Sequence, residues 1–325
     1  MTSSLLSDLR QRARGLNQRI ALPESADERV LDAAARAAES GLVRPILVSA
    51  HALDAPTGVE VLVPSHDERL SEMAAEIAAD RDRRPEEILE RLHDPLHYAC
   101  ALVRDGRADA AVMGAVATTA ETLRAALRVV GVDARYQVVT SCFLMELPSR
   151  VLVYADCGVV PKPTPPQLAD IAMQAAESYR ALVGGEPTVA LLSFSTHGSA
   201  RHESLEPVVE ALGLLRERGV DFAVDGELQA DAALVPEIGS RKAPGSAVAG
   251  QANVLVFPDL NSGNIAYKIT ERLAGARAVG PLLQGLALPI HDLSRGCSSE
   301  DILDTMAIAA LDALRLAGHD PRRQA

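Results

Sequence analysis

The sequence alternates short apolar runs with longer amphipathic segments, and this alternation predicts the fold. Apolar runs at residues 20–22 and 45–49 predict strands. Between them, Ser25 to Glu28 form a capping box that opens a helix, and Gly41 ends that helix. A strand, a helix and a second strand in succession form a βαβ unit, which requires a parallel sheet.

The same alternation continues along the chain with one change of rhythm. Further strands are predicted at residues 59–63, 109–113, 189–192, 222–224 and 254–257. Further helices are predicted at residues 3–16, 67–80, 85–92, 167–182, 203–217, 264–273 and 299–316, and two more begin near residues 95 and 120. Residues 136–145 and 151–156 instead alternate like paired strands. We therefore expect an α/β protein with two three-layer α/β/α domains, mainly parallel sheets and a cleft between the domains.

Polar residues collect at predicted strand ends in the stretch from residue 252 to residue 301. Ser294, Arg295 and Gly296 follow an apolar run at residues 279–289. Ligands of open α/β sheets bind at the carboxyl ends of the strands. A Ser-Arg-Gly turn there offers a hydroxyl, a bidentate guanidinium and backbone N–H groups, which together suit an anion.

Residues 114–119 are a second candidate for anion binding. This loop of small residues lies between a predicted strand and the helix that begins near residue 120. A strand, a small-residue loop and a helix N-terminus together can cradle an anion. A plain turn explains the same residues, and the residues alone favour the plain turn.

The charge and the cysteines exclude several classes of protein. The formal net charge of −12 and the 3% aromatic content argue against a nucleic-acid binder. The four cysteines fit no zinc spacing, no metal site is evident, and buried thiols suit a reducing compartment. The N-terminus has no signal-peptide core and no apolar run approaches ~20 residues, so we predict a cytoplasmic protein without membrane contact.

Two stretches carry a family resemblance. Residues 252–269 (ANVLVFPDLNSGNIAYKI) and 287–302 (ALPIHDLSRGCSSEDI) resemble the signature of phosphate acetyltransferases, within the phosphate acetyl/butyryl transferase family. The resemblance extends from Arg19 to the last predicted helix. It implies reversible transfer of acetyl between coenzyme A (CoA) and inorganic phosphate in acetate metabolism. The implied partners are CoA, acetyl-CoA, phosphate, acetyl phosphate and a second copy of the chain as a homodimer. No permanently bound cofactor is implied, because CoA and acetyl-CoA are substrates.

The resemblance also implies a discontinuous first domain and three catalytic residues. Residues 1–136 and 285–325 would form domain I, with residues 137–284 inserted as domain II. Asp301 would be the base for the CoA thiol, because a free thiol with a pKa near ~8.5 is mostly protonated at neutral pH. Arg295 would hold the phosphoryl group, and Ser294 would hydrogen-bond the thioester. Asp301 also fits a capping box with Ser298, so a purely structural role stays open.

Further substrate-binding residues follow from the resemblance alone. Arg124 and, less securely aligned, Arg81 would contact CoA or phosphate, and Arg83 and Arg84 compete with Arg81 for that role. The remaining candidates would border the acyl-phosphate pocket, with salt bridges as the alternative for the two lysines: Thr196, Gly198, Ser199, Asn261, Asn264, Lys242 and Lys268.

Three departures from the family pattern keep other functions open. Met113, Ala117 and His197 stand where the family usually has a serine, a histidine and a lysine. These changes leave open a phosphate transacylase for a longer acyl group such as butyryl, or a non-catalytic domain that senses CoA or acetyl-CoA. A serine triad with His291 is disfavoured because no orienting acid follows a known pattern. A dehydrogenase is disfavoured because no GxGxxG follows a strand.

Overall fold

The structure is a computed structural model that describes residues 4–317. The described chain divides into two compact units. Unit 1 takes the described residues up to Asp133 and from Leu286 onward, and unit 2 takes Ala134–Gly285. No helix among residues 4–317 is long and apolar enough to cross a membrane.

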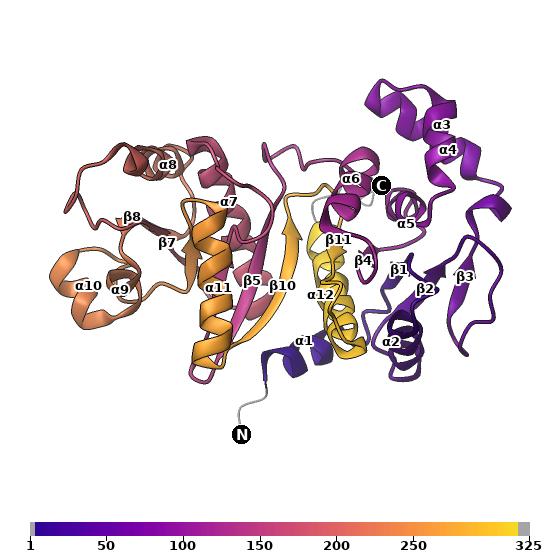
Figure 1. Ribbon diagram of the computed structural model, residues 1–325, viewed down its shortest axis with the longest axis horizontal. Helices are drawn as coiled ribbons and strands as arrows, with labels where there is room; N and C mark the ends of the chain where they lie inside the picture. The colour runs from indigo at the N-terminus through magenta and orange to yellow at the C-terminus, as the bar shows by residue number, and fades with distance from the viewer. Residues whose placement is uncertain (1–3, 318–325) are drawn as a thin grey trace. The chain divides into compact units, whose positions relative to one another are not determined.

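Unit 1 is built on a five-stranded parallel sheet with the order β11-β4-β1-β2-β3 (Figure 1). Its strands are β1 (Arg19–Leu22), β2 (Arg44–Val48), β3 (Glu60–Leu62), β4 (Ala110–Met113) and β11 (Ile290–Asp292). The edge strand β11 comes from the far end of the chain and pairs Ile290 with Ala111 of β4. All four residues of β4 are buried, as expected for a central strand of a parallel sheet.

Helices interleave with these strands in the chain. They are α1 (Leu5–Ala13), α2 (Glu28–Glu39), α3 (Leu70–Arg81), α4 (Pro85–Leu92), α5 (Pro95–Arg104), α6 (Thr119–Val129) and α12 (Ser299–Ala317). Helix α12 packs against α1, α2 and β4. Every residue of α12 from 302 to 313 is buried, so this helix forms the centre of unit 1 rather than its surface. Its buried Asp304 is neutralised by Arg10 of α1, whose Nε lies 2.6 Å from Oδ1.

Unit 2 contains a mixed six-stranded sheet with the order β10-β5-β6-β9-β7-β8. Its strands are β5 (Thr140–Leu147), β6 (Arg150–Ala155), β7 (Thr188–Leu192), β8 (Ala223–Leu228), β9 (Val254–Val256) and β10 (Arg277–Gln284). Strand β5 runs antiparallel to both β6 and β10, and the other pairings are parallel. The helices are α7 (Pro165–Ser178), α8 (Glu206–Glu217), α9 (Ala230–Leu234), α10 (Pro236–Lys242) and α11 (Leu260–Ala274).

The predicted α/β fold with mainly parallel sheets is confirmed, and some of its predicted elements differ in the structure. Helix α11 begins four residues earlier than predicted, because Asp259 caps it by accepting the N–H of Ser262 at 2.8 Å. The four residues before the predicted start, 260–263, therefore form the first turn of this helix. The apolar run at 279–289 is a strand only up to Gln284, because β10 ends before Gly285, where φ is +77°, and β11 begins after the run at Ile290. Helices α9 and α10 were not predicted.

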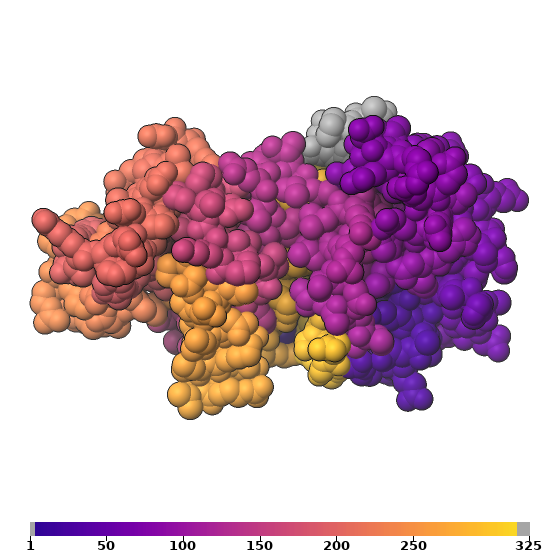
Figure 2. All heavy atoms as spheres, turned by 45° about the horizontal axis from the view of Figure 1, so that its top comes forward, coloured from indigo at the N-terminus to yellow at the C-terminus, as the bar shows by residue number. Residues whose placement is uncertain are grey.

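Helix α11 packs closely at Gly263 against the backbone that follows β6. Gly263 is its buried residue, and most of the helix stands on the surface of unit 2, in orange in Figure 2. A Cβ at Gly263 would lie 2.2 Å from the carbonyl oxygen of Asp156. The helix can approach this backbone only because residue 263 has no side chain.

Replacing Gly263 with alanine should therefore destabilise the protein, although alanine usually stabilises a helix. We expect Gly263→Ala to lower the free energy of unfolding by about 1–3 kcal/mol. Gly213 of α8 is the matched control, because a Cβ there meets no atom within 4 Å. Gly213→Ala should raise the free energy of unfolding by about 0.5–1 kcal/mol. Urea unfolding of both variants measures this, and shifts of the same sign would contradict the close packing.

Candidate functional site

Arg29 joins three loops at the carboxyl edge of the sheet in unit 1. Its guanidinium donates hydrogen bonds to the carbonyl oxygens of Ala115 (2.8 Å), Arg295 (2.9 Å) and Cys297 (2.8 Å). These residues follow β4 and β11, while Arg29 itself stands at the start of α2. Asp27, 2.8 Å from Nη2, holds the guanidinium in place, and this pair lowers the pKa of Asp27. The sequence analysis did not identify Arg29, although its place after the first strand was a usable signal.

The small-residue loop after β4 does hold an anion, and the anion is the protein's own Glu24. The carboxylate of Glu24 accepts the backbone N–H groups of Gly114, Ala115, Val116 and Ala117 at 2.7–2.9 Å. A carboxylate suits this position because successive N–H groups at a helix start create a positive field. These four donors are therefore already used and are not free for a substrate phosphate.

Gly114 allows the loops after β4 and β11 to touch. Its φ of +103° lies in the region that favours glycine, and a Cβ would come within 2.4 Å of Oδ1 of Asp292. Asp292 ends β11, is buried, and accepts a hydrogen bond from the Thr119 hydroxyl at 2.6 Å. Its Oδ1 has no hydrogen-bond partner in the described chain. Burial, with the nearby charge of Glu24, raises the pKa of Asp292 to about 6.

Ser294 and Arg295 project from the loop after β11 with their functional groups available. The Ser294 hydroxyl accepts the N–H of Gly296 at 3.3 Å, which leaves its own proton free to be donated. Arg295 is exposed, and within residues 4–317 its guanidinium has no hydrogen bond or ion pair. Arg124 of α6 is exposed in the same way. Both arginines lower the pKa of Glu121 through their positive charge. The largest cause of that lowering is the hydrogen bond from the Thr118 N–H.

Asp301 caps helix α12. Its Oδ2 accepts the N–H and the hydroxyl of Ser298, both at 2.8 Å, and its own N–H donates to that hydroxyl at 3.2 Å. The structural role considered for Asp301 is therefore present in the fold. The other oxygen, Oδ1, accepts no hydrogen bond within the described chain, and the side chain is exposed. Capping thus leaves one carboxylate oxygen available.

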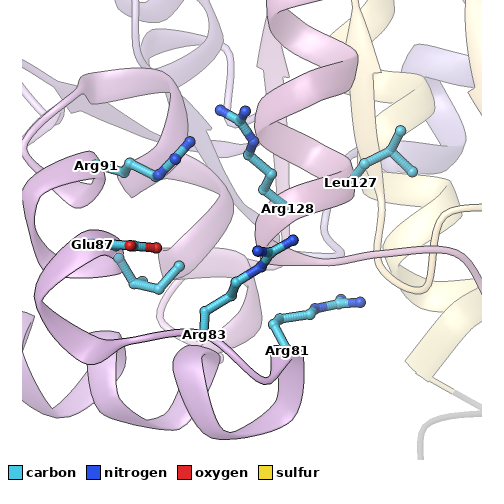
Figure 3. Close-up of a pocket in the computed structure, with 7 residues that line it drawn as sticks. Arg81, Arg83, Glu87, Arg91, Leu127 and Arg128 are labelled. Carbon is cyan, nitrogen blue, oxygen red and sulfur yellow. The ribbon is translucent and has the colours of Figure 1, made fainter.

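Arg81 lies differently from the other candidate residues of unit 1. Its Nη2 donates to the carbonyl oxygen of Val130, beyond the end of α6, and the side chain lies against Gly131. Partial burial and the neighbouring Arg104 lower its pKa. In Figure 3 its guanidinium points away from Arg91, which faces Arg128 across a pocket. Arg81 therefore anchors the C-terminal end of α6 in this structure.

In unit 2 the loop after β7 docks on the end of β8. Gly198 N–H donates to Glu227 at 2.7 Å, and the Ser199 hydroxyl accepts the N–H of Thr196 at 3.1 Å. The Thr196 hydroxyl accepts the N–H of Gln229 at 3.0 Å. Lys242 reaches the same Gln229 with its Nζ at 2.9 Å. The structure therefore brings Thr196, Ser199 and Lys242 together. The residues that connect them, Glu227 and Gln229, were not identified in the sequence analysis.

His197 in the same loop takes the place of a lysine expected from the family pattern. Its backbone has a φ of +46°, and its Nε2 lies 3.1 Å from Oδ2 of Asp225. The imidazole is thus turned onto β8. This departure puts an imidazole held by an aspartate where the family pattern has an ammonium group.

The start of α11 holds the remaining candidates. Asn264 donates from Nδ2 to the carbonyl oxygen of Cys157 at 3.1 Å and accepts from Lys268 Nζ at 3.0 Å. Lys268 also lies over the Tyr267 ring, 4.2 Å from its centroid. Asn261 is exposed in the first turn. Asn264 and Lys268 form one cluster a helical turn apart, and the Asn261 side chain makes no hydrogen bond to it within residues 4–317.

The structure predicts a pH dependence of stability that comes from Asp292. Its pKa of about 6 in the folded chain lies about two units above the ~3.9 of an unfolded aspartate. The protonated Asp292 side chain therefore stabilises the folded chain fully below pH ~4. This stabilisation, about 3 kcal/mol, is lost as the pH rises through about 6.

Asp292→Asn should remove this dependence. Relative to the wild type, the variant should gain about 3 kcal/mol in free energy of unfolding between pH ~4 and pH ~8. Urea unfolding at several pH values measures the difference, with Asp32→Asn, an exposed aspartate of α2, as the control. A difference that does not change with pH would show that Asp292 titrates normally.

The sequence and the fold are similar to those of known proteins along nearly the whole chain. The family described as Phosphate acetyl/butaryl transferase matches residues 4–310. The chain is 43% identical over 327 residues to a phosphate acetyltransferase from Acetivibrio thermocellus, covering 95% of this chain and 98% of the relative. It is 46% identical over 315 residues to a phosphate acetyltransferase from Paracoccus denitrificans, covering 94% and 98%.

A solved structure adds agreement in fold. The phosphotransacetylase from Streptococcus pyogenes superposes with a TM-score of 0.90 at 39% identity, covering 96% of this chain and 98% of that chain. The match of family, sequence and fold confirms the predicted resemblance. This chain belongs to the phosphate acetyl/butyryl transferase family.

Proposed function

We propose that this chain is a phosphate acetyltransferase, which catalyses acetyl-CoA + phosphate = acetyl phosphate + CoA. The relatives that share 43% and 46% of its residues carry that name. The observation that carries the proposal is the Ser294–Arg295 turn after β11, where a hydroxyl stands beside a guanidinium that has no partner among residues 4–317. A site that must gather a dianionic nucleophile needs such a cation.

The proposed reaction is a direct attack without an acyl-enzyme. A phosphate oxygen held by Arg295 forms a bond to the thioester carbon, the carbon–sulfur bond breaks, and the proton of the hydrogen phosphate passes by way of Asp301 to the sulfur that leaves. The Ser294 hydroxyl donates a hydrogen bond to the carbonyl oxygen while negative charge develops there, and keeps its proton when the carbonyl re-forms. In the reverse direction, Oδ1 of Asp301 takes the thiol proton as sulfur attacks acetyl phosphate. A carboxylate is a weaker base than a thiolate, so this step needs the bound substrate to exclude water.

The remaining candidates have binding roles in this proposal. In unit 1, Arg124 contacts phosphate groups of CoA. In unit 2, Lys242, Lys268 and the loop of Thr196, Gly198 and Ser199 supply cations and donors to substrate oxygens, as do Asn261 and Asn264. CoA and acetyl-CoA enter as substrates rather than as a resident cofactor. A cytoplasmic location stays a prediction.

We also propose that the chain forms a homodimer. Helix α11 exposes Ile265, Ile269 and Leu273 by 55%, 52% and 83%, spaced one turn apart. An antiparallel two-fold pairing of α11 with its copy would place Ile269 at the axis and Ile265 against Leu273, so the stripe is complementary to itself. Light scattering that gives a monomer mass would contradict this proposal.

The test of the reaction is thiol release from acetyl-CoA with and without phosphate. The wild type should release thiol only with phosphate. Asp301→Asn should lose about 10²–10⁴-fold in rate, the usual contribution of a general base, while the amide oxygen still accepts from Ser298. Ser298→Ala is the matched control, since it removes the cap at a cost of about 0.5–2 kcal/mol in stability and spares the base.

Each alternative has its own outcome in the same assay. Equal rates with and without phosphate would indicate a thioesterase and exclude the phosphate reaction. Binding of CoA without any thiol release would favour the sensing domain. Full activity of Asp301→Asn would leave Asp301 with the capping role alone. Faster phosphate-dependent release from butyryl-CoA than from acetyl-CoA would assign the longer acyl group.

A further inference from the structure

Two helices of unit 1 hold the side chain that precedes Asp301. Glu300 stands in the first turn of α12, and its Oε1 lies 2.5 Å from Nη1 of Arg10 in α1. Its Oε2 lies 2.5 Å from Nη2 of Arg36 in α2. We call Glu300, Arg10 and Arg36 the Glu300 clamp. Hydrogen bonds from Arg36 and then from Arg10 lower the pKa of Glu300, so the clamp is charged at neutral pH.

Arg10 also holds the peptide group that joins Glu300 to Asp301. Its Nη2 donates to the Glu300 carbonyl oxygen at 3.1 Å. The N–H of the same peptide group belongs to Asp301 and donates to the Ser298 hydroxyl at 3.2 Å. Because a peptide group is planar, bonds at its C=O and at its N–H together fix its orientation. The position of the Asp301 Cα atom follows from that plane.

The first turn of α12 is exposed and depends on such contacts for its order. Residues 298 and 301 are exposed, whereas every residue from 302 to 313 is buried. Helix ends fray where the core does not hold them. Arg10 connects the two parts, because its Nε lies 2.6 Å from Oδ1 of Asp304, whose side chain is 2% exposed. The clamp therefore ties the exposed turn to the turn that the core fixes.

Glu300 and Asp301 point in different directions from the same turn. Neighbouring residues of a helix point about 100° apart, so their side chains do not face each other. The Glu300 carboxylate is turned to α1 and α2, whereas the Asp301 carboxylate is turned to Ser298. Any influence of Glu300 on Asp301 therefore passes through the backbone of the turn that they share.

We propose that Glu300, held by Arg10 and Arg36, is a positioning residue for the base Asp301. The clamp fixes the first turn of α12, and the fixed turn directs Oδ1 of Asp301 toward the sulfur of the substrate. This inference rests on the function proposed above, in which Asp301 carries the proton to and from that sulfur. A displacement of about 1 Å in an active site can lower the rate about 10²-fold, so the clamp acts on kcat rather than on substrate binding.

Steady-state kinetics of phosphate-dependent thiol release test the proposal. Glu300→Ala should lower kcat about 10–10²-fold and leave KM for acetyl-CoA within about twofold of the wild type. Arg36→Gln, which removes one of the two cations, should reproduce part of this loss. Asp32→Asn is the matched control, because Asp32 contacts the same guanidinium of Arg36 at 3.4 Å and is not part of the clamp. It should keep the wild-type kcat.

A double-mutant cycle separates positioning of the base from every other effect of Glu300. When Asp301→Asn has removed the base, Glu300→Ala has nothing left to position. The double variant should therefore have the same kcat as Asp301→Asn alone. A further loss in the double variant, equal to the loss that Glu300→Ala causes in the wild type, would overturn the proposal.

Amide hydrogen exchange of the full chain measures the order of the turn without relying on activity. Glu300→Ala should lower the protection of the Asp301 and Ile302 amides, which donate to Ser298, and Asp32→Asn should leave it unchanged. The melting temperature of Glu300→Ala should change little, because half-exposed ion pairs contribute little to stability. Unchanged protection in Glu300→Ala would overturn the proposal.

The failure of this proposal differs from the failure of the proposed function. A wild-type kcat in Glu300→Ala, beside a slow Asp301→Asn, would overturn the positioning role and leave the proposed function standing. Full activity of Asp301→Asn would remove the base and overturn the positioning role with it. A wild type without phosphate-dependent thiol release would overturn the proposed function, and the exchange measurement would then decide by itself whether the clamp orders the turn.

Discussion

Two charged side chains hold the loops at the carboxyl edge of the sheet in unit 1 by hydrogen bonds to their backbone groups. Loops that follow parallel strands leave N–H and C=O groups unpaired, and a folded chain must satisfy them. Glu24 takes four N–H groups of the loop after β4, and Arg29 donates to carbonyl oxygens of the loops after β4 and β11. The two act on opposite kinds of backbone group, so neither can replace the other. The Ser294–Arg295 turn is thereby held in place by the protein before any substrate binds.

This arrangement separates the groups that build the site from those that remain free to bind. The backbone donors that looked suited to phosphate are used by Glu24, and the guanidinium of Arg29 is used by carbonyl oxygens and Asp27. The side chains of Arg295 and Arg124 carry no such contacts in the described chain. Anion binding in unit 1 therefore depends on side-chain charge rather than on the loop amides, and it should weaken as salt concentration rises.

Much of the fold follows from local patterns in the sequence. The alternation of apolar runs and amphipathic helices predicted the βα order, and the Thr118–Glu121 and Ser298–Asp301 boxes mark where α6 and α12 begin. One kind of error in the predicted elements arose where a single capping residue moves the start of a helix, as Asp259 does for α11. The other arose at short helices such as α9 and α10, which have too few residues to show a helical hydrophobic period. A helix of five residues hardly completes one turn and a half, too little for a hydrophobic face.

The candidate site was predictable by residue type but not by partner. The sequence placed Ser294, Arg295 and Asp301 in one short stretch because they are near neighbours in the chain. It did not reveal that Glu24 fills the loop 90 residues away, or that Arg81 bonds to a carbonyl group 49 residues away. Such partners depend on which strands are adjacent, and the pairing of β1 with β4 is a property of the whole sheet. The resemblance to a family supplied roles for these residues, and the contacts decide which of them are free to perform those roles.

The cap and the base proposed for Asp301 are physically compatible. The cap uses Oδ2 and points that oxygen at Ser298, which fixes the rotamer of the carboxylate at the start of α12. Fixing one oxygen also fixes the direction of Oδ1, so the group does not lose rotational freedom when the thiol arrives. A residue that closes a helix can therefore present a base at little additional entropic cost, and the loop that carries Ser294 and Arg295 lies directly before it.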